Sequence, residues 1–351
     1  MSAHPSGSRK TKVVLTVDTE PSVAGALAPG GSHTPLIREP IAGWVDGESQ
    51  GLGFILKTLG RFGLTATFFV ETAHTHYFSD NAMGEYVEAL LDAGQDVQLH
   101  LHPCWLTFER RREDWPATVT DDCHHLPADR LLELIEHGAD KIAAWSGTRP
   151  TGMRTGNFST SLSVFEAMSA AGLRYASNIC LAVHRPPEPE LALEGGAGEF
   201  CGVRELPVTC FRDVGPVGRG RLRPMAVTAL RVEEQIDLLN AAHDNGNAAV
   251  VILTHPFEFF KTRNFRYTDL RRNRVTQKRL ADLCSFLSGN SDRFDVVPLS
   301  AACDSINEPP TWRQLHGNAF RSVARAVENV LNDRVRFMAL IGFRGGERRS
   351  G

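Results

Sequence analysis

Two histidines, His100 and His102, stand at the end of a short run that is typical of a β-strand. Residues 96–103 read Asp-Val-Gln-Leu-His-Leu-His-Pro, so apolar and polar side chains alternate until a proline ends the run. Side chains on a strand point alternately to its two faces, and both imidazoles should therefore project to the same side. Two neutral imidazoles on one face form half of a divalent-metal site. The alternative is a pair of polar residues at a strand end, with one ring hydrogen-bonded to a carbonyl group.

Further polar groups follow other predicted strands. Asp18 and Glu20 come directly after the apolar run 13–17, and both face the same way if the chain stays extended there. Arg154 stands at the end of a fourth run, and His255 closes a later one just before a proline. Two histidines and a carboxylate, with positions left open for water, are the ligand set of hydrolytic metal sites.

The elements that would position these residues are short β-rich runs that alternate with helical segments. The predicted strands are 13–17, 64–70, 97–101, 151–154, 173–177, 204–208, 249–254 and 294–299. Apolar residues recur at helical spacing in 49–62, 83–93, 127–145, 161–171, 232–245 and 276–287. This alternation predicts an α/β protein with βα units and a mainly parallel sheet. Seven or eight units in about 290 residues favour a closed or distorted barrel over an open sheet.

We divide the chain into three parts. Residues 1–11 are a polar, flexible N-terminus, residues 12–304 form the barrel, and residues 305–351 form a C-terminal helix with a basic tail. Within the last part, residues 311–333 have an apolar side, which predicts an amphipathic helix. Its apolar residues are Phe320, Val323, Val327, Val330 and Leu331. We expect this helix to dock onto the barrel, with an oligomer contact as the alternative.

Two long connections, 21–47 and 181–201, are rich in Gly and Pro and follow predicted strand ends. Insertions of this length in a compact domain are usually functional loops or mobile ones, and loops after the strands carry the active site in βα barrels.

Composition and charge restrict the classes of function. A formal net charge of −3 gives no basis for binding nucleic acid or an anionic membrane. We expect no membrane span, because no run of about 18 apolar residues is present. Seven scattered cysteines without Cys-x-x-Cys spacing, and an N-terminus without an apolar leader, predict a cytoplasmic protein. No glycine-rich fingerprint follows a strand, so we expect no dinucleotide cofactor.

Five short segments occur in the order of the motifs of the polysaccharide deacetylase superfamily, the nodulation-deacetylase-like carbohydrate esterases of family four. Leu15–Glu20 resembles the first motif of this family, and Thr65–Val70 is similar to its second strand. Gly94–Pro103 resembles the histidine motif, Met153–Gly156 the arginine motif and Ile252–His255 the last histidine motif. Each segment is short, and the ordered set carries the resemblance.

The resemblance implies a distorted (β/α)7 barrel, one divalent metal ion, often zinc, and hydrolysis of an N-acyl amide on a sugar. The family's first motif has two adjacent aspartates, a base followed by a metal ligand, but Thr19 holds the second position here. Either Glu20 or Asp18 therefore supplies the carboxylate ligand. We assign Glu20 to the metal and Asp18 to catalysis.

The histidine motif also departs from the family pattern. In the family, three residues separate the two histidine ligands, so the second stands four positions after the first. Here His102 is only two positions after His100, and Cys104 stands where the family has its second histidine. We favour His102 as the ligand because the His-Pro ending of the motif is kept, although a Cys104 thiolate is chemically possible for zinc. No copy of the family's acidic, tryptophan-containing motif is found; the nearest segment is 205–209.

These residues define a candidate mechanism. Asp18 removes a proton from the attacking water, Arg154 orients Asp18, and His255 protonates the leaving amine. The expected partner is a carbohydrate or another small molecule. Two alternatives stay open: an amidase that cleaves a small non-sugar C–N bond, and an inactive barrel that serves as a binding subunit.

Overall fold

The core of the protein is a curled sheet of mainly parallel strands. The structure, a computed structural model, describes residues 10–27, 33–79, 81–108, 121–214, 220–264, 266–306 and 312–342. Within these residues seven parallel strands pair in the order β12-β1-β4-β5-β6-β7-β9, and β8 adds an antiparallel edge. Their bounds are β1 Thr11–Thr19, β4 Thr67–Glu71, β5 Asp96–Leu101, β6 Gly152–Thr155, β7 Tyr175–Ala176, β8 Gly198–Phe200, β9 Val203–Glu205 and β12 Ala249–Thr254. A further strand, β15 Phe294–Val296, pairs with the start of β1.

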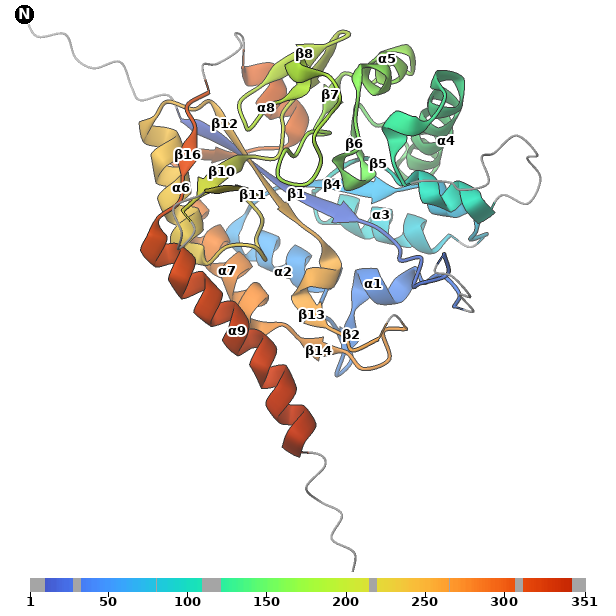
Figure 1. Ribbon diagram of the computed structural model, residues 1–351. Helices are drawn as coiled ribbons and strands as arrows, with labels where there is room; N and C mark the ends of the chain where they lie inside the picture. The colour runs from blue at the N-terminus through green and yellow to red at the C-terminus, as the bar shows by residue number, and fades with distance from the viewer. Residues whose placement is uncertain are drawn as a thin grey trace, which may run out of the picture.

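Amphipathic helices alternate with these strands and pack against the sheet (Figure 1). They are α2 Leu52–Phe62, α3 Ala82–Asp92, α4 Ala128–Ser146, α5 Leu162–Ala170, α6 Val232–Asp244 and α7 Arg274–Gly289. The helix α2 shows the local cause: Leu52, Ile55 and Leu59 recur on one side and are buried. The helix ends at Gly63, whose φ of 63° is the left-handed conformation that glycine adopts without strain. The predicted alternation of strands and helices is confirmed.

Irregular chain bridges the gap between the two end strands of the parallel sheet. The Thr209 N–H donates to the Val251 carbonyl of β12 at 3.1 Å, and the Val208 N–H donates to the Ile179 carbonyl, after β7, at 2.9 Å. Residues 208–209 therefore join the two sides of the sheet without forming a regular strand. This arrangement is a distorted (β/α)7 barrel, as the sequence and the family resemblance predicted.

Smaller elements lie in the connections. The connection 21–47 contains α1 Arg38–Ala42 and β2 Trp44–Val45, and β2 pairs with β3 Glu48–Ser49. A three-stranded sheet is formed by β10 Cys210–Asp213, β11 Arg221–Pro224 and β16 Leu315–His316. A short hairpin is formed by β13 Phe260–Lys261 and β14 Arg271–Arg272.

Two predicted elements have different bounds in the structure. The predicted strand 294–299 ends at Val296, and a helix, α8 Leu299–Ser305, begins directly after Pro298. A proline that fixes φ suits the position before a helix, and it has no N–H for a strand ladder. The predicted helix 311–333 begins only at Ala319, as α9 Ala319–Gly342, because Asn318 accepts the Phe320 N–H on its side chain.

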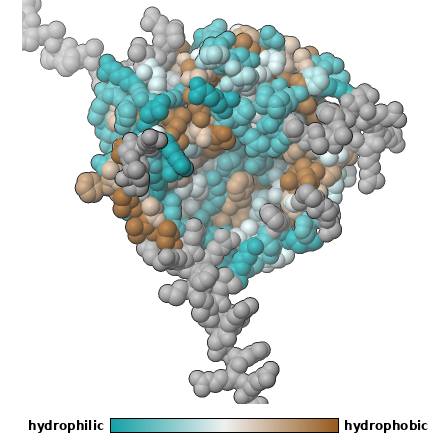
Figure 2. Space-filling view, viewed as in Figure 1, coloured by the Kyte–Doolittle hydropathy of each residue, from teal (hydrophilic) through white to brown (hydrophobic). Residues whose placement is uncertain are grey.

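The helix α9 docks onto the body through its polar side. The Arg325 guanidinium is buried and lies 2.5 Å from Asp213, and it also pairs with Glu234 of α6. The apolar side faces outward: the Phe320 side chain is 87% exposed and that of Val323 is 57% exposed. Figure 2 shows a group of brown, hydrophobic atoms at the lower left, where the first turns of α9 lie in Figure 1. The expected docking is therefore present, but through the opposite side of the helix. An oligomer contact through α9 stays a prediction.

Among the described residues, no helix combines the length and the apolar character that crossing a bilayer requires.

Candidate active site

Neighbouring strands of the parallel sheet end side by side, and several of them carry predicted site residues. Val17 of β1 lies beside Thr254 of β12, and His100 of β5 lies beside Arg154 of β6. Parallel strands present their carboxyl ends at one edge, where βα barrels hold their active sites. All six predicted residues meet at this edge, in two adjoining groups.

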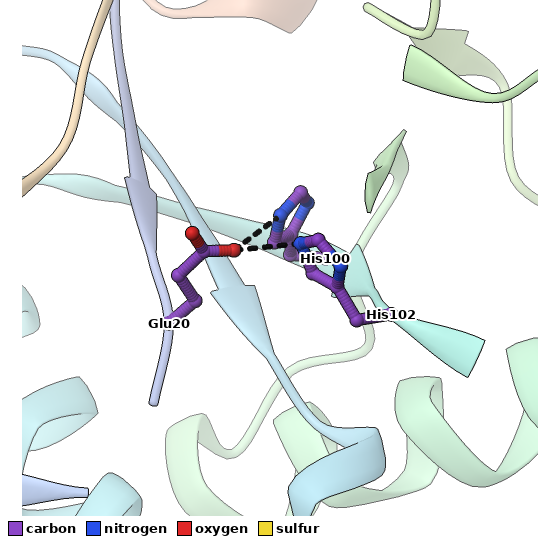
Figure 3. A group of neighbouring side chains, drawn as sticks. All are labelled: Glu20, His100 and His102. Carbon is purple, nitrogen blue, oxygen red and sulfur yellow. Dashed lines mark hydrogen bonds and ion pairs between the residues drawn. The ribbon is translucent and has the colours of Figure 1, made fainter. Parts of the chain in front are cut away.

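The first group consists of Glu20, His100 and His102 (Figure 3). Oε2 of Glu20 lies 3.3 Å from Nε2 of His100 and 2.7 Å from Nε2 of His102. The possible ligand atoms of the three residues all lie within 4.8 Å of one another. The two imidazoles project to the same side, as the alternation along the strand predicted, and Glu20 points toward them from the end of β1.

The other ring nitrogens of both histidines have fixed partners. Nδ1 of His100 lies 2.8 Å from the Arg154 carbonyl oxygen, and Nδ1 of His102 lies 2.7 Å from Oδ2 of Asp121. A proton on each Nδ1, donated to these oxygens, leaves each Nε2 with a lone pair toward Glu20. Histidines that bind metals are oriented in this way, by a carbonyl or a carboxylate on the far nitrogen.

The carboxylates of Glu20 and Asp121 favour a positive charge at or between the two imidazoles. Burial opposes ionisation of Glu20, but His102 and His100 hold the pKa of this carboxyl well below its usual range. Burial also opposes protonation of His102, but the carboxylates of Glu20 and Asp121 raise its pKa well above the ordinary value. Either protons or a metal cation can supply the positive charge that these carboxylates attract.

Cys104 lies beside the same group. Its thiol could form a second set of ligands with His102 and Asp121, because these three residues also lie close enough together. Burial, and then the charge of Asp121, raises the pKa of the Cys104 thiol far above its ordinary value. Since a thiol must lose its proton to bind zinc, this environment is less suited to a cysteine ligand than to the imidazole of His102.

The second group consists of Asp18, Arg154 and His255. Oδ1 of Asp18 accepts a hydrogen bond from Nη1 of Arg154 at 2.7 Å. The other oxygen, Oδ2, lies 3.8 Å from Nε2 of His255. Asp18 is thus held between a permanent cation and an imidazole, in a position separate from the two histidines that contact Glu20.

Arg154 is completely buried and is held by several hydrogen bonds. Its Nε and Nη2 donate to the carbonyl and hydroxyl oxygens of Ser177, and Nη1 also donates to Thr16. The guanidinium carbon lies 4.3 Å from the ring centroid of Phe69. With four of its N–H donors committed, the guanidinium is held facing Asp18.

Glu258 fixes the orientation of His255. Its carboxylate lies 3.2 Å from Nδ1 of His255, accepts the His255 backbone N–H, and is itself held by the hydroxyl groups of Thr254 and Thr228. Burial alone would lower the pKa of His255, but the hydrogen bond and charge of Glu258, assisted by Asp18, raise it to about 9. His255 therefore carries a proton near neutral pH in this environment.

Glu71 is a further buried carboxyl at the same edge. It ends β4 beside His100, and its Oε1 accepts the Ala73 N–H at 2.5 Å. Burial raises the pKa of Glu71 to about 8, against the opposing charge of His102. In this environment Glu71 is protonated near neutral pH.

A cavity of about 250 Å³ opens beside the first group. Glu20, His102 and Asp121 lie on its polar side, and the rings of Trp105, Phe257 and Tyr267 contribute to its walls. Residues 21–23 of the first long connection also line it, which confirms the prediction that this loop lies at the site. The second connection, 181–201, contributes none of the described lining residues.

Three of these residues, Asp121, Glu258 and Glu71, were missed by the analysis of the sequence. Glu258 could have been found, because a glutamate three residues after a helix-capping position often bonds back to the cap. Glu71 could also have been found, since it follows a predicted apolar strand. Asp121 gives no such signal: it lies 19 residues beyond His102, after a stretch that carries no motif.

No protein-family model matches the chain, and no curated protein matches it in sequence. Solved structures do match. A protein from Mycobacterium smegmatis that is assigned as a polysaccharide deacetylase superposes with a TM-score of 0.55 at 16% identity, over 89% of this chain and 96% of that chain. This superposition confirms the fold that the family resemblance implied, for a divergent sequence.

Two further structures overlap less closely. A peptidoglycan deacetylase from Bacillus subtilis gives a TM-score of 0.35 at 16% identity, over 85% of this chain and 91% of that chain. A family 4 carbohydrate esterase from Streptomyces lividans, in complex with acetate, gives a TM-score of 0.38 at 15% identity, over 88% of this chain and 98% of that chain. TM-scores this low do not by themselves define a shared fold.

Proposed function

We propose that the protein is a metal-dependent hydrolase that removes an N-acyl group, most simply acetyl, from an amino-sugar substrate or precursor. The observation that carries the proposal is the adjacency of two groups: three metal-type ligands within 4.8 Å of one another, and an Asp18–His255 pair separated by 3.8 Å. Amide hydrolysis needs a base for water, an acid for the amine and stabilisation of the carbonyl oxygen, and the two groups together can supply all three.

The first group fits one divalent ion, with zinc as the first choice. Two imidazole nitrogens and one carboxylate oxygen are the ligands of catalytic zinc sites, and the far nitrogens of His100 and His102 are already held by oxygen acceptors. Such an ion, when bound, supplies Lewis-acid stabilisation of the negative charge that develops on an amide carbonyl. Glu20 is the better carboxylate ligand because Asp18 is committed to Arg154.

Asp18 acts as the base in this proposal. Its Oδ1 is occupied by Arg154, so Oδ2 is the atom left to take the proton of the attacking water. The buried guanidinium fixes the carboxylate plane, which keeps Oδ2 aimed at the same place throughout the reaction.

His255 acts as the acid. Its Nδ1 is held by Glu258, and its Nε2 faces Asp18. The raised pKa keeps the proton on the imidazole until the leaving nitrogen takes it. Two adjacent side chains then carry out the proton transfers: Asp18 removes a proton from water, and His255 donates one to the leaving nitrogen.

The cavity supports a carbohydrate as the substrate class. Aromatic rings beside carboxylates suit a sugar, which presents both C–H faces and hydroxyl groups. The shared fold with a protein assigned as a polysaccharide deacetylase supports the same class.

The test is acetate release by the zinc-loaded protein from N-acetylglucosamine oligomers, with His100→Ala as the matched inactive control. We expect release that requires both the metal and His100. Hydrolysis of small non-sugar amides without release from the sugars would favour the amidase alternative. Saturable sugar binding without any hydrolysis would favour the inactive binding subunit.

A further inference from the structure

Two buried cysteines, Cys180 and Cys210, lie in direct contact beside the place where the barrel closes. Their Sγ atoms are 3.9 Å apart, although the two residues are 30 positions apart in the chain. Both side chains are completely buried, and neither belongs to the two groups of the candidate active site. Buried cysteines usually serve as small apolar side chains in a core, so contact alone does not make this pair reactive.

The pair flanks the backbone hydrogen bonds that connect the two sides of the barrel. Cys180 follows Ile179, whose carbonyl oxygen accepts the Val208 N–H at 2.9 Å. Cys210 follows Thr209, whose N–H donates to β12 at 3.1 Å. A bond between the two sulfur atoms would therefore join the chain after β7 to the chain that is bonded to β12, where irregular backbone takes the place of a strand.

The two thiols have different surroundings. The hydrogen bond with the Cys210 thiol lowers the pKa of Cys180, and backbone N–H groups in the turn that follows act in the same direction. Burial opposes this shift, while the nearby charge of Arg154 adds to it. The same contact, and then burial, raises the pKa of the Cys210 thiol far above its ordinary value. Cys180 is therefore the thiol that ionises first, and the thiolate is the reactive form in cysteine oxidation.

Cys180 begins a turn at the surface of the molecule. The backbone N–H groups of Val183 and His184 both donate to the Cys180 carbonyl oxygen, at 2.9 Å and 3.0 Å. The Val183 side chain is 55% exposed. Local opening of this short turn gives a small oxidant a route to the Cys180 sulfur without unfolding of the barrel.

We propose that Cys180 and Cys210 form a reversible disulfide on reaction with hydrogen peroxide, and that this bond joins the two sides of the folded barrel. The Cys180 thiolate attacks one peroxide oxygen, the O–O bond breaks, and the leaving hydroxide takes up a proton to become water. The Cys210 sulfur then attacks the sulfenic acid, the S–O bond breaks, and the Cys210 proton leaves with the hydroxyl group as a second water. Two thiols are oxidised to one disulfide while one peroxide is reduced to two waters. The sulfur atoms must approach each other by about 2 Å to reach disulfide bond length.

The test is treatment of the folded full chain with a small molar excess of hydrogen peroxide, then alkylation of free thiols, digestion without reduction and mass spectrometry. We expect a peptide that links Cys180 to Cys210, loss of two alkylatable thiols per chain, and recovery of both after dithiothreitol. This readout needs neither metal nor substrate, so it does not depend on the proposed hydrolysis. Absence of the linked peptide, whether the two thiols stay free or pair with other cysteines, would overturn the proposal.

Cys210→Ser and Cys284→Ser are matched variants, because each replaces one completely buried thiol, and Cys284 lies on α7. After peroxide treatment, Cys210→Ser should form no linked peptide and should carry a sulfenic acid at Cys180, which dimedone traps. Cys284→Ser should form the linked peptide as fully as the unmodified chain. A dimedone adduct missing from Cys180 would contradict the assigned order of attack, and loss of the linked peptide in Cys284→Ser would contradict the assigned pair.

Thermal unfolding tests whether the bond fits the folded barrel. A disulfide that closes a loop of this length stabilises a protein mainly by restricting its unfolded chain. The linked chain should therefore have a Tm about 5 °C above that of the reduced chain, whereas peroxide should not raise the Tm of Cys210→Ser. An unchanged or lower Tm of the linked chain would show that the bond forms only with distortion of the barrel, and would overturn the claim that it joins the two sides of the folded structure.

Discussion

Asp18 and Glu20 lie two positions apart and have different surroundings. Asp18 is bound to the buried Arg154, whereas Glu20 contacts His100 and His102. The sequence left open which carboxylate binds the metal, because that depends on the neighbouring strands and not on the strand that carries both residues. At the scale of single residues, the division of roles follows from the contacts of each side chain.

We expect Asp18→Asn to lower kcat about a hundredfold or more, because the amide keeps the shape of the carboxylate but cannot take a proton. The measurement is the rate of acetate release at saturating substrate. Asp295→Asn is the control: Asp295 pairs with Lys12 near the surface, and its loss should leave kcat unchanged. Near-normal turnover in Asp18→Asn would remove Asp18 from the mechanism.

We expect Glu258→Gln to shift the basic limb of the pH–rate profile to lower pH. His255 must be protonated to act as the acid, so kcat/KM falls as the pH rises through the pKa of His255. Glu258 raises that pKa to about 9, and a bound cation would lower it in both proteins alike. The basic limb of Glu258→Gln should therefore lie at lower pH than that of the unmodified enzyme. An unchanged limb would mean that another group donates the proton.

At the scale of elements, the strands of the barrel were predictable, but the bounds of the short ones were not. The runs at 13–17, 97–101 and 249–254 are apolar enough to be recognised locally, and they form β1, β5 and β12. By contrast, only two residues of the predicted strand 173–177 form β7, and residues 208–209 join the barrel without strand geometry. Asp121 reaches His102 across space, which no local pattern indicates.

The close approach of β5 and β6 makes Gly156 a sensitive position. A Cβ atom there would lie 2.4 Å from Nδ1 of His102. Gly156→Ala should therefore displace the imidazole from Asp121 and weaken zinc affinity roughly tenfold to a hundredfold. Gly60→Ala in α2 is the control, because no atom lies within 4 Å of the added carbon. Competition with a chelating dye measures both, and equal affinities would contradict the packing argument.

At the scale of the whole molecule, α9 is attached by buried charges and not by an apolar face. Arg325 contacts both Asp213 of β10 and Glu234 of α6, and all three side chains are almost fully buried. The amphipathic pattern predicted the helix, but it could not indicate which side would face the barrel. The buried partners of Arg325 lie about a hundred residues earlier in the chain.

We expect Arg325→Ala to lower the free energy of unfolding by about 3 kcal/mol, because it leaves the buried carboxylate of Glu234 without the cation that pairs with it. Arg321→Ala, which removes an exposed pair with Asp237, should lower it by less than about 1 kcal/mol. Urea denaturation followed by circular dichroism measures both values. Similar, small losses in the two variants would show that α9 contributes little to the stability of the barrel.

Metal content measured by mass spectrometry is the most direct test of the central claim, that Glu20, His100 and His102 form a metal centre. After loading with zinc and desalting, the unmodified protein and Cys104→Ala should each retain one zinc per chain. His100→Ala and His102→Ala should retain none, with circular dichroism confirming that both are folded. Full occupancy in His102→Ala together with loss in Cys104→Ala, or no zinc in the unmodified protein, would contradict the account.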